Sequence, residues 1–182
     1  MIRLLPKKKS MCRSGHRRSL LNLVSVPRTT GAGIGRSNFR SINEFGDAVF
    51  DRYQVFTDQA YAKTIGQVAS GRIANDPLVI GRVVDARARS ALRRWLANEG
   101  IDEGAGGIIQ VNRWLRDPTA GSSAYRIPDV RIPGANISLD GTIGWKSATT
   151  PQIRDFRLFS GGDNVTIVRP TQIGGSYGIV FP

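Results

Sequence analysis

Apolar residues recur every three or four positions between residues 41 and 100, and this spacing predicts helices. The clearest helix begins at Asp76-Pro77, where a capping acid precedes a first-turn proline, and it ends before Gly100. Another helix, capped by Ser41 or Asn43, is expected to run to about residue 57, and a second helical stretch covers roughly 58–70. The expected buried stripe of the clearest helix comprises Ile80, Val84, Ala88, Leu92, Trp95 and Leu96.

The second half of the chain has a different pattern, typical of short strands between turns. Strands are expected at residues 125–132, 137–146, 164–169 and 177–181, and residues 108–115 form either a short strand or a turn of helix. One helix interrupts them, capped by Thr150, opened by Pro151 and ended by Gly161-Gly162. This order predicts an α+β fold, with N-terminal helices, then a small mixed β-sheet with a flanking helix.

Charge divides the chain into two parts. The 182 residues carry a formal net charge of +12, and ten of the 26 Lys and Arg residues lie within residues 1–45, against one acid, Glu44. We therefore expect residues 1–40 to be a basic, disordered N-terminal extension and residues 41–182 to be a single domain. A basic extension attracts polyanions such as nucleic acid, although it also fits a solvated tail without a specific ligand.

The chain has one cysteine and one histidine, which limits the kinds of catalytic and metal-binding site that it can form. Cys12 excludes an internal disulfide, and His16 lies in the basic extension, so the expected domain has no histidine. Catalysis there would depend on carboxylates, lysine, hydroxyl groups or a bound metal. No segment is long enough to cross a membrane. Residues 1–43 fit an organelle transit peptide or a linker from a larger chain better than a secretory signal.

Arginines line a second face of the helix that follows Asp76. The three that lie along this face are Arg82, Arg89 and Arg93, with Arg87 and Arg94 beside them. Five arginines on one helix suit contact with a phosphate backbone, so these residues are candidate DNA contacts. A solvated face of an amphipathic helix explains the same pattern.

Candidate catalytic residues gather between residues 125 and 156. Pro128-Asp129 opens a strand, and residues 133–136 have turn chemistry. A simple turn places Asp129 opposite Asp140, whereas a bulge or a longer turn moves it toward Gly144, so the sequence does not fix the register. On a regular strand, Asp140 and Lys146 share a face, and Trp145 then points toward the core. On the following helix, Gln152 and Asp155 share a face. Carboxylates bind Mg²⁺ through oxygen, and a neighbouring lysine or glutamine can orient the attacking water.

These segments resemble a known family. Arg-Ile-Pro-Asp at 126–129, Gly-Trp-Lys at 144–146 and Pro-Gln-Ile-Arg-Asp-Phe at 151–156 resemble the PD-(D/E)XK nuclease superfamily, and most closely its bacterial polymorphic-toxin branch. The resemblance implies a restriction-endonuclease-like core and a toxin or effector that cleaves DNA with Mg²⁺ or Mn²⁺. It also implies an acidic immunity protein as partner and secretion or delivery into the cytoplasm of a target cell.

The resemblance also assigns roles to particular residues. It implies that Asp129 is the first metal ligand, that Lys146 is the catalytic lysine and that Gln152 is the helix residue typical of the toxin branch. Asp140 and Asp155 complete the candidate catalytic set, with Asp129 and Asp140 as metal ligands and Arg126 as a further DNA contact.

Gly144 departs from the family pattern. The second acid of the family stands two residues before the lysine, where this chain has Gly144. Either Asp140 replaces it, or Asp155 or Glu99 reaches in from a helix, or the site is inactive. On a regular strand Asp140 lies about 13 Å from Gly144, so replacement requires a bulge at Asp140-Gly141 or a metal bound nearer to Asp140.

Two other functions fit the sequence. One is a non-catalytic nucleic-acid-binding or structural protein that keeps a nuclease-like fold as scaffold. The other is an enzyme acting on a different phosphate-containing substrate. Near the C-terminus, Gly174-Gly175-Ser176 fits either a phosphate-contacting turn or a plain hairpin loop, and the loop is favoured.

Overall fold

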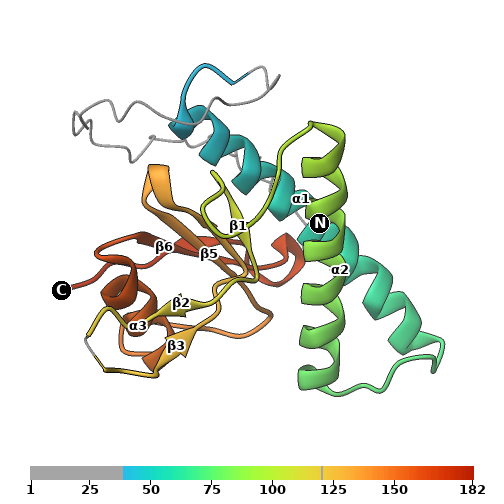
Figure 1. The fold of residues 1–182 in the computed structure, drawn as a ribbon. Helices are drawn as coiled ribbons and strands as arrows, with labels where there is room; N and C mark the ends of the chain where they lie inside the picture. Colours follow the sequence, from blue (N-terminus) through green and yellow to red (C-terminus); the bar gives the residue numbers. More distant parts are fainter. Residues whose placement is uncertain (1–38, 120) are drawn as a thin grey trace, which may run out of the picture. The chain divides into compact units, whose positions relative to one another are not determined.

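The computed structural model describes residues 39–119 and 121–182, which all belong to one compact unit, Gly33–Pro182. The fold is α+β, as the sequence predicts, with three α-helices and a mixed five-stranded sheet (Figure 1). The expectation of disorder for residues 1–40 lies almost wholly outside the described residues. Within the described residues, no helix combines the length and the apolar character needed to cross a membrane.

Two long helices, α1 (Ile42–Ala69) and α2 (Pro77–Asn98), pack against each other beside the sheet (Figure 1). The Ser41 side chain caps α1 by accepting from the Glu44 amide at 3.1 Å. The two helical segments expected over residues 43–70 are thus one continuous helix, because no glycine or proline breaks its backbone near residue 57.

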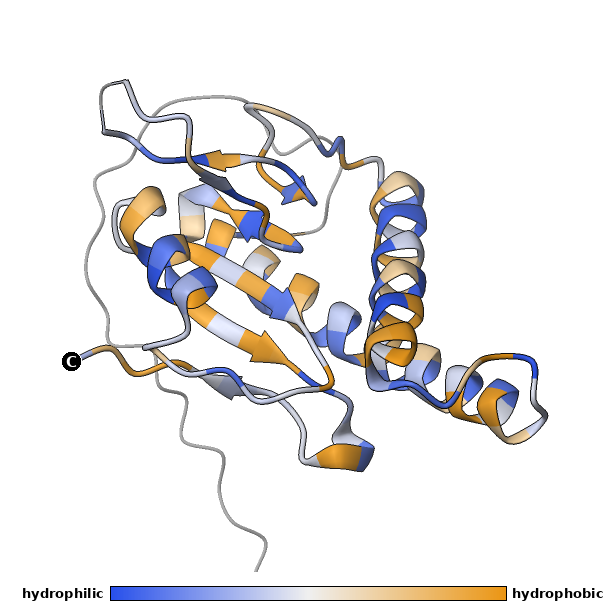
Figure 2. Cartoon of the chain, turned by 90° about the horizontal axis from the view of Figure 1, so that it is seen from below, coloured by the Kyte–Doolittle hydropathy of each residue, from blue (hydrophilic) through white to orange (hydrophobic). Residues whose placement is uncertain are grey.

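The predicted boundaries of α2 are confirmed. The Asp76 side chain accepts from the amides of Leu78 and Val79, and Gly100 adopts a φ of +68° just beyond the helix. Most of the predicted stripe is buried, and Trp95 is only partly so. Figure 2 shows apolar and polar segments alternating along this helix.

The five-stranded sheet has the order β1-β4-β5-β6-β7. Its strands are β1 (Gln110–Val111), β4 (Val130–Ile132), β5 (Ile137–Gly141), β6 (Asn164–Val168) and β7 (Tyr177–Gly178). β5 and β6 are parallel, and the other pairs are antiparallel. A separate two-stranded sheet pairs β2 (Leu115–Arg116) with β3 (Tyr125–Arg126). Short 3₁₀ turns, η1 (Pro133–Ala135) and η2 (Thr171–Ile173), follow β4 and β6.

The connection between β5 and β6 contains α3 (Pro151–Ser160), which begins after Thr150 and ends at Gly161, as predicted. Its Ile153 and Phe156 pack with Val165 and Ile167 of β6 in one core cluster. The opposite side of the sheet contributes Val130, Ile132, Leu139 and Val168 to the core formed with α1 and α2. The sheet therefore lies between the α1–α2 pair and α3.

Several strands are shorter than predicted. The segment 125–132 is broken at Ile127-Pro128-Asp129, because proline donates no backbone hydrogen bond to a ladder. The segment 137–146 ends at Gly141, after which the chain turns. Because β5 ends at Gly141, Asp140, Gly144 and Lys146 do not share one face of a strand, and that prediction is wrong. Trp145 does not enter the core either, since 74% of it is exposed.

Candidate active site

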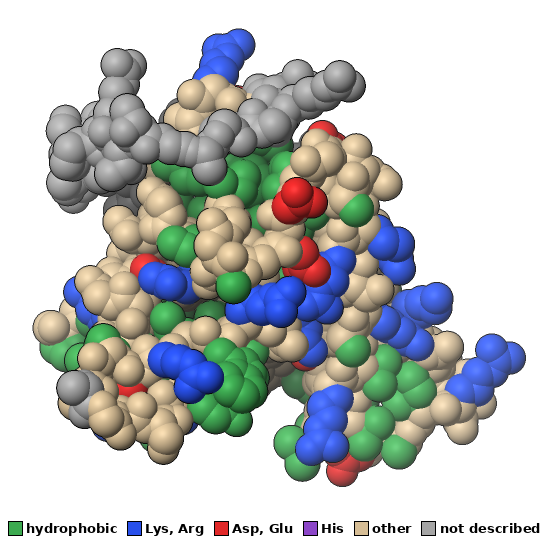
Figure 3. Space-filling view, in the orientation of Figure 1, with side chains coloured by type: hydrophobic (Ala, Val, Ile, Leu, Met, Phe, Trp, Pro, Cys, Tyr) green, Lys and Arg blue, Asp and Glu red, His purple; other side chains and the backbone are tan. Residues whose placement is uncertain are grey.

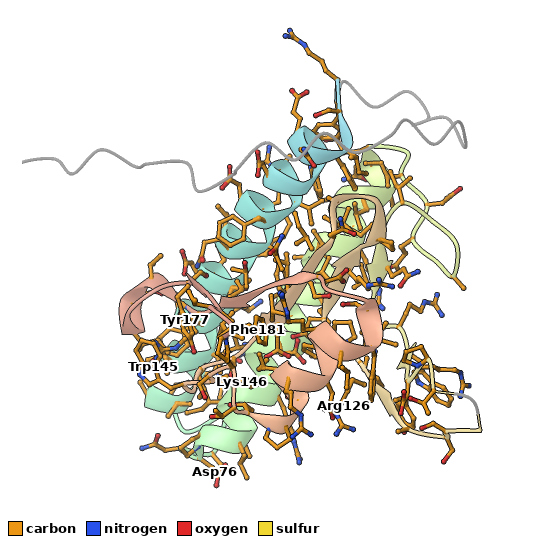
Figure 4. All side chains as sticks on the ribbon, turned by 90° about the vertical axis from the view of Figure 1, so that its left-hand side faces the viewer. Asp76, Arg126, Trp145, Lys146, Tyr177 and Phe181 are labelled. Carbon is orange, nitrogen blue, oxygen red and sulfur yellow. The ribbon has the colours of Figure 1, made fainter. Side chains whose placement is uncertain are left out.

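Four predicted residues meet where β5 ends. Lys146 Nζ donates to Asp140 Oδ2 at 2.6 Å and to Gln152 Oε1 at 2.9 Å. The Gln152 amide donates in turn to Asp140 Oδ1 at 3.1 Å. Asp129 lies across from Asp140, one residue beyond the pair Val130–Leu139, as a simple turn predicts. Both carboxylates are buried, and Figure 4 labels Lys146 among the side chains of this region.

The local chain path explains why Lys146 reaches Asp140. After β5 the backbone turns through residues 142–147, so Lys146 folds back along the strand instead of continuing it. Tyr177 of β7 fixes this return: its hydroxyl accepts from the Lys146 amide at 2.8 Å and donates to the Lys146 carbonyl at 2.9 Å. No bulge at Asp140-Gly141 is needed, because both residues pair regularly with β6.

Asp129 is held from the other side. Its Oδ2 accepts from the Gly141 amide at 2.6 Å, and its Oδ1 lies 3.5 Å from Arg89 Nη1. Arg89 in turn forms an ion pair at 2.6 Å with Asp85, one turn earlier on α2. Asp85 is therefore a third carboxylate of the cluster, which the sequence analysis did not identify. The available signal was that Asp85 is the only acid within α2, among five arginines.

A small cavity adjoins the carboxylates. It measures about 10 Å³, and its lining includes Tyr53, Asp85, Gly141 and Thr142. Two buried oxygens near it have no hydrogen-bond partner, Tyr53 Oη and Asp85 Oδ1. Tyr53 belongs to α1, and nothing in the sequence pattern indicates that its hydroxyl approaches Asp129 and Gly141.

The electrostatics of this cluster are those of crowded acids. Burial raises the pKa of the Asp129 carboxyl well above its ordinary 3.8, and the charges of Asp85 and Asp140 raise it further. Burial also raises the pKa of Asp85 and of Asp140, against the opposing influence of Arg89 and Lys146 respectively. The pKa of the Tyr53 hydroxyl rises well above 10.0 for the same reason, burial first and then Asp129. Such shifts are typical of sites that bind a cation or transfer protons.

Divalent cations relieve this kind of repulsion, and the residues present fit one. Among the described residues, no three acidic, histidine or cysteine side chains form a ready cage for a metal. Mg²⁺ does not require such a cage, because it keeps several waters and uses one or two carboxylates with substrate phosphate. Asp129 and Asp140, the predicted ligands, remain suitable, and Asp85 adds an oxygen without a partner.

Two other acids considered from sequence lie elsewhere. Asp155 pairs with Arg126 at 2.5 Å and with Arg154 at 3.0 Å, which ties α3 to β3. Among the described residues, no hydrogen bond joins Asp155 to Asp140 or Lys146. Glu99 caps the far end of α2, about 21 Å along the helix from Asp85.

The predicted DNA-contacting arginines separate in the structure. Arg89 belongs to the carboxylate cluster, and Arg93 binds Glu103 and the Val111 carbonyl. Arg126 is paired with Asp155. Arg82 instead lines an open groove of about 690 Å³ between α1 and α2, whose other basic residues are Lys63, Arg87 and Arg94 and whose lining has no acid. Figure 3 shows Lys and Arg side chains on the α2 side of the face it displays.

Comparison with protein-family models, curated proteins and solved structures finds no match for this chain. The function of the site therefore has to be inferred from its geometry alone.

Proposed function

We propose that this chain is a metal-dependent nuclease with a restriction-endonuclease-like core, which hydrolyses phosphodiester bonds of DNA. The observation that carries the proposal is the contact of Lys146 with both Asp140 and Gln152, beside the buried Asp129. Asp129, Lys146 and Gln152 come from the three sequence segments that carry the resemblance to the nuclease pattern, and their proximity supports the proposal.

Each side chain has a definite task in this proposal. Lys146 uses two of its three N–H donors on Asp140 and Gln152, which leaves one for a phosphate oxygen or the attacking water. Asp140 holds the ammonium group in place with both of its oxygens engaged. Asp129 and Asp140 would hold Mg²⁺ or Mn²⁺, which would supply Lewis-acid activation of water and neutralise charge on the phosphate.

In this proposal Asp140 also replaces the acid that the family pattern has at position 144, where this chain has glycine. The carboxylate that neighbours the lysine comes from the strand end six residues before it, instead of two. The missing acid at position 144 therefore does not by itself make the site inactive in our proposal. Asp155 and Arg126 act in it as a structural pair between α3 and β3.

The biological setting follows only from the family resemblance. We propose a toxin or effector domain that is delivered into the cytoplasm of a target cell and neutralised by an acidic immunity protein. The basic groove lined by Arg82, Arg87 and Arg94 fits the phosphate backbone of DNA in this proposal.

Plasmid nicking tests the proposal. The full chain is incubated with supercoiled DNA and Mg²⁺ or Mn²⁺, with and without a chelator. We expect metal-dependent cleavage that falls roughly 10²–10⁴-fold in Lys146→Ala and Asp140→Asn, the range for loss of a proton-transferring or charge-stabilising group. Arg72→Ala and Asp51→Asn, which alter exposed charges on the first interhelical turn and on α1, should keep wild-type activity.

The alternative is a non-catalytic nucleic-acid-binding or structural protein with a degenerate nuclease-like fold. The absence of a ready three-residue metal cage in the described part of the chain favours it. DNA binding without cleavage under any metal condition would establish this alternative, and cleavage of equal rate by Lys146→Ala would place the chemistry elsewhere.

A further inference from the structure

Arg169, the residue after β6, has a buried positive charge without an anion. Only 4% of Arg169 is exposed, and its Nε and Nη1 atoms have no hydrogen-bond partner. Its Nη2 makes a single long bond of 3.4 Å, to the Ile143 carbonyl. Among the described residues, no carboxylate forms an ion pair with it. A guanidinium buried in this state is costly, and a bound anion would offset that cost.

The backbone of Arg169 is fixed, which gives the guanidinium a defined position. The Arg169 carbonyl accepts from Gln54 of α1 at 2.9 Å, and the Arg169 amide donates to the Ser176 hydroxyl at 3.1 Å. Gly174 lies so close that an added Cβ would be 3.2 Å from Nη1. The Gly174 and Gly175 amides are themselves used within the turn. This loop therefore supports the arginine and is not itself a phosphate cradle.

Trp145 covers Arg169 from the solvent side. The guanidinium carbon lies 4.3 Å from the centre of the Trp145 ring. The centres of the Trp145 and Tyr177 rings are 4.8 Å apart. Figure 4 shows Trp145 and Tyr177 close together and near Lys146. The cover is lightly held, because 74% of Trp145 is exposed and an added Cβ at the preceding Gly144 would meet only the Thr142 hydroxyl, at 3.7 Å. A cation–π contact offsets only part of the cost of burying the charge, and less than an anion would.

We propose that Arg169 is a phosphate-binding residue beside Lys146, and that Trp145 covers it until a phosphate group of the substrate displaces the ring. The proposal rests on the proposed function for its source of phosphate, a polynucleotide strand. The position of Arg169 is consistent with a polynucleotide as the source of phosphate. Trp145, which covers it, directly precedes Lys146, and Tyr177 contacts both Trp145 and Lys146. Arg169 would then hold a phosphate group close to the one that reacts, as a positioning residue.

Calorimetric titration with inorganic phosphate tests whether Arg169 binds phosphate. It requires neither metal nor DNA cleavage, and chloride keeps the ionic strength constant. We expect wild-type binding, at least tenfold weaker in Arg169→Gln. Arg157→Gln is the matched control, because Arg157 of α3 makes a similar contact with the Phe181 ring, at 4.7 Å, and this variant should bind phosphate as wild type does. Trp145→Ala should bind phosphate at least as tightly as wild type, because no cover has to move.

Three outcomes overturn the proposal: no phosphate binding by wild type, unchanged binding by Arg169→Gln, or weakened binding by Trp145→Ala. If Arg169→Gln fails to fold, Trp145→Ala decides, since the substituted side chain is largely exposed. Repeating the titration with a mononucleotide and with an uncleavable oligonucleotide identifies the phosphate source. A chain that binds phosphate through Arg169 but never cleaves DNA would keep this site and refute the proposed function.

Discussion

The ammonium nitrogen of Lys146 lies 2.6 Å from Oδ2 of Asp140, although a regular strand would hold the two residues far apart. The contact arises because β5 stops at Gly141 and the chain folds back, with the Lys146 backbone pinned by the Tyr177 hydroxyl. The position of one strand end thus decides whether a carboxylate accompanies the candidate catalytic lysine.

Gly144→Asp tests whether Asp140 already fills the role of the acid expected at position 144. An added Cβ at Gly144 meets only the Thr142 hydroxyl, at 3.7 Å, so the variant should fold normally. Because Lys146 is already engaged by Asp140, we expect the cleavage rate of Gly144→Asp to stay within about threefold of wild type. A gain of tenfold or more, measured with the same plasmid assay, would show that position 144 lacks a needed acid.

Asp129→Asn tests the crowding of buried acids through the pH dependence of stability. A carboxyl with a raised pKa in the folded state favours folding most at pH values below its ordinary 3.8, and this contribution is lost as pH rises through the raised value. Placing a negative charge on Asp129 in the folded state therefore costs stability. We expect the free energy of unfolding of Asp129→Asn to exceed that of wild type at pH 7, because the amide side chain carries no charge in this crowded, buried position.

Two further readings separate this effect from general stabilisation. The advantage of Asp129→Asn should shrink as pH falls toward 3.8, and added Mg²⁺ should raise the melting temperature of wild type more than that of the variant. Chemical denaturation across pH and thermal melts with Mg²⁺ measure the two quantities. A variant that is less stable than wild type at pH 7 would contradict the crowding argument.

Gly141→Ala tests the close packing around the cavity. An added Cβ would stand 2.7 Å from Tyr53 Oη and 3.2 Å from Asp129 Oδ2, so one of them must move. We expect a loss of about 1–3 kcal/mol in the free energy of unfolding, together with reduced cleavage. Tyr53→Phe removes a buried hydroxyl without a partner and should be nearly neutral for stability.

The double variant supplies the control. Adding Tyr53→Phe to Gly141→Ala should recover part of the lost stability, because the closest clashing atom is gone. Strictly additive effects in a double-mutant cycle would show that the two residues do not meet as the structure places them.

Asp155→Ala tests the structural reading of a residue that sequence analysis assigned to catalysis. Because Asp155 is buried against Arg126 and Arg154, its loss should lower the free energy of unfolding by about 1–3 kcal/mol. The cleavage rate per folded molecule should change by less than about fivefold. A loss as large as that of Lys146→Ala, with unchanged thermal stability, would return Asp155 to the catalytic set.

The sequence by itself determined the features that depend on local chemistry. Asp76-Pro77 with Gly100, and Pro151 with Gly161, delimit α2 and α3 because capping and glycine conformations act over a few residues. These are short-range effects, so the sequence was sufficient to predict them. The register of the hairpin was different: the turn at residues 133–136 was predicted, but a bulge or a longer turn would have moved Asp129 toward Gly144, and the structure places it across from Asp140.

Only the tertiary structure decided which side chains complete the site. The return of Lys146 to Asp140 depends on Tyr177, 31 residues later. Asp85 and Tyr53 reach Asp129 because α2 and α1 pack against the end of the sheet, and neither position has a local signature for that approach. Arg169 is left without an anion by the same packing. Contacts between distant segments depend on how whole elements pack, and no periodicity within one segment records them.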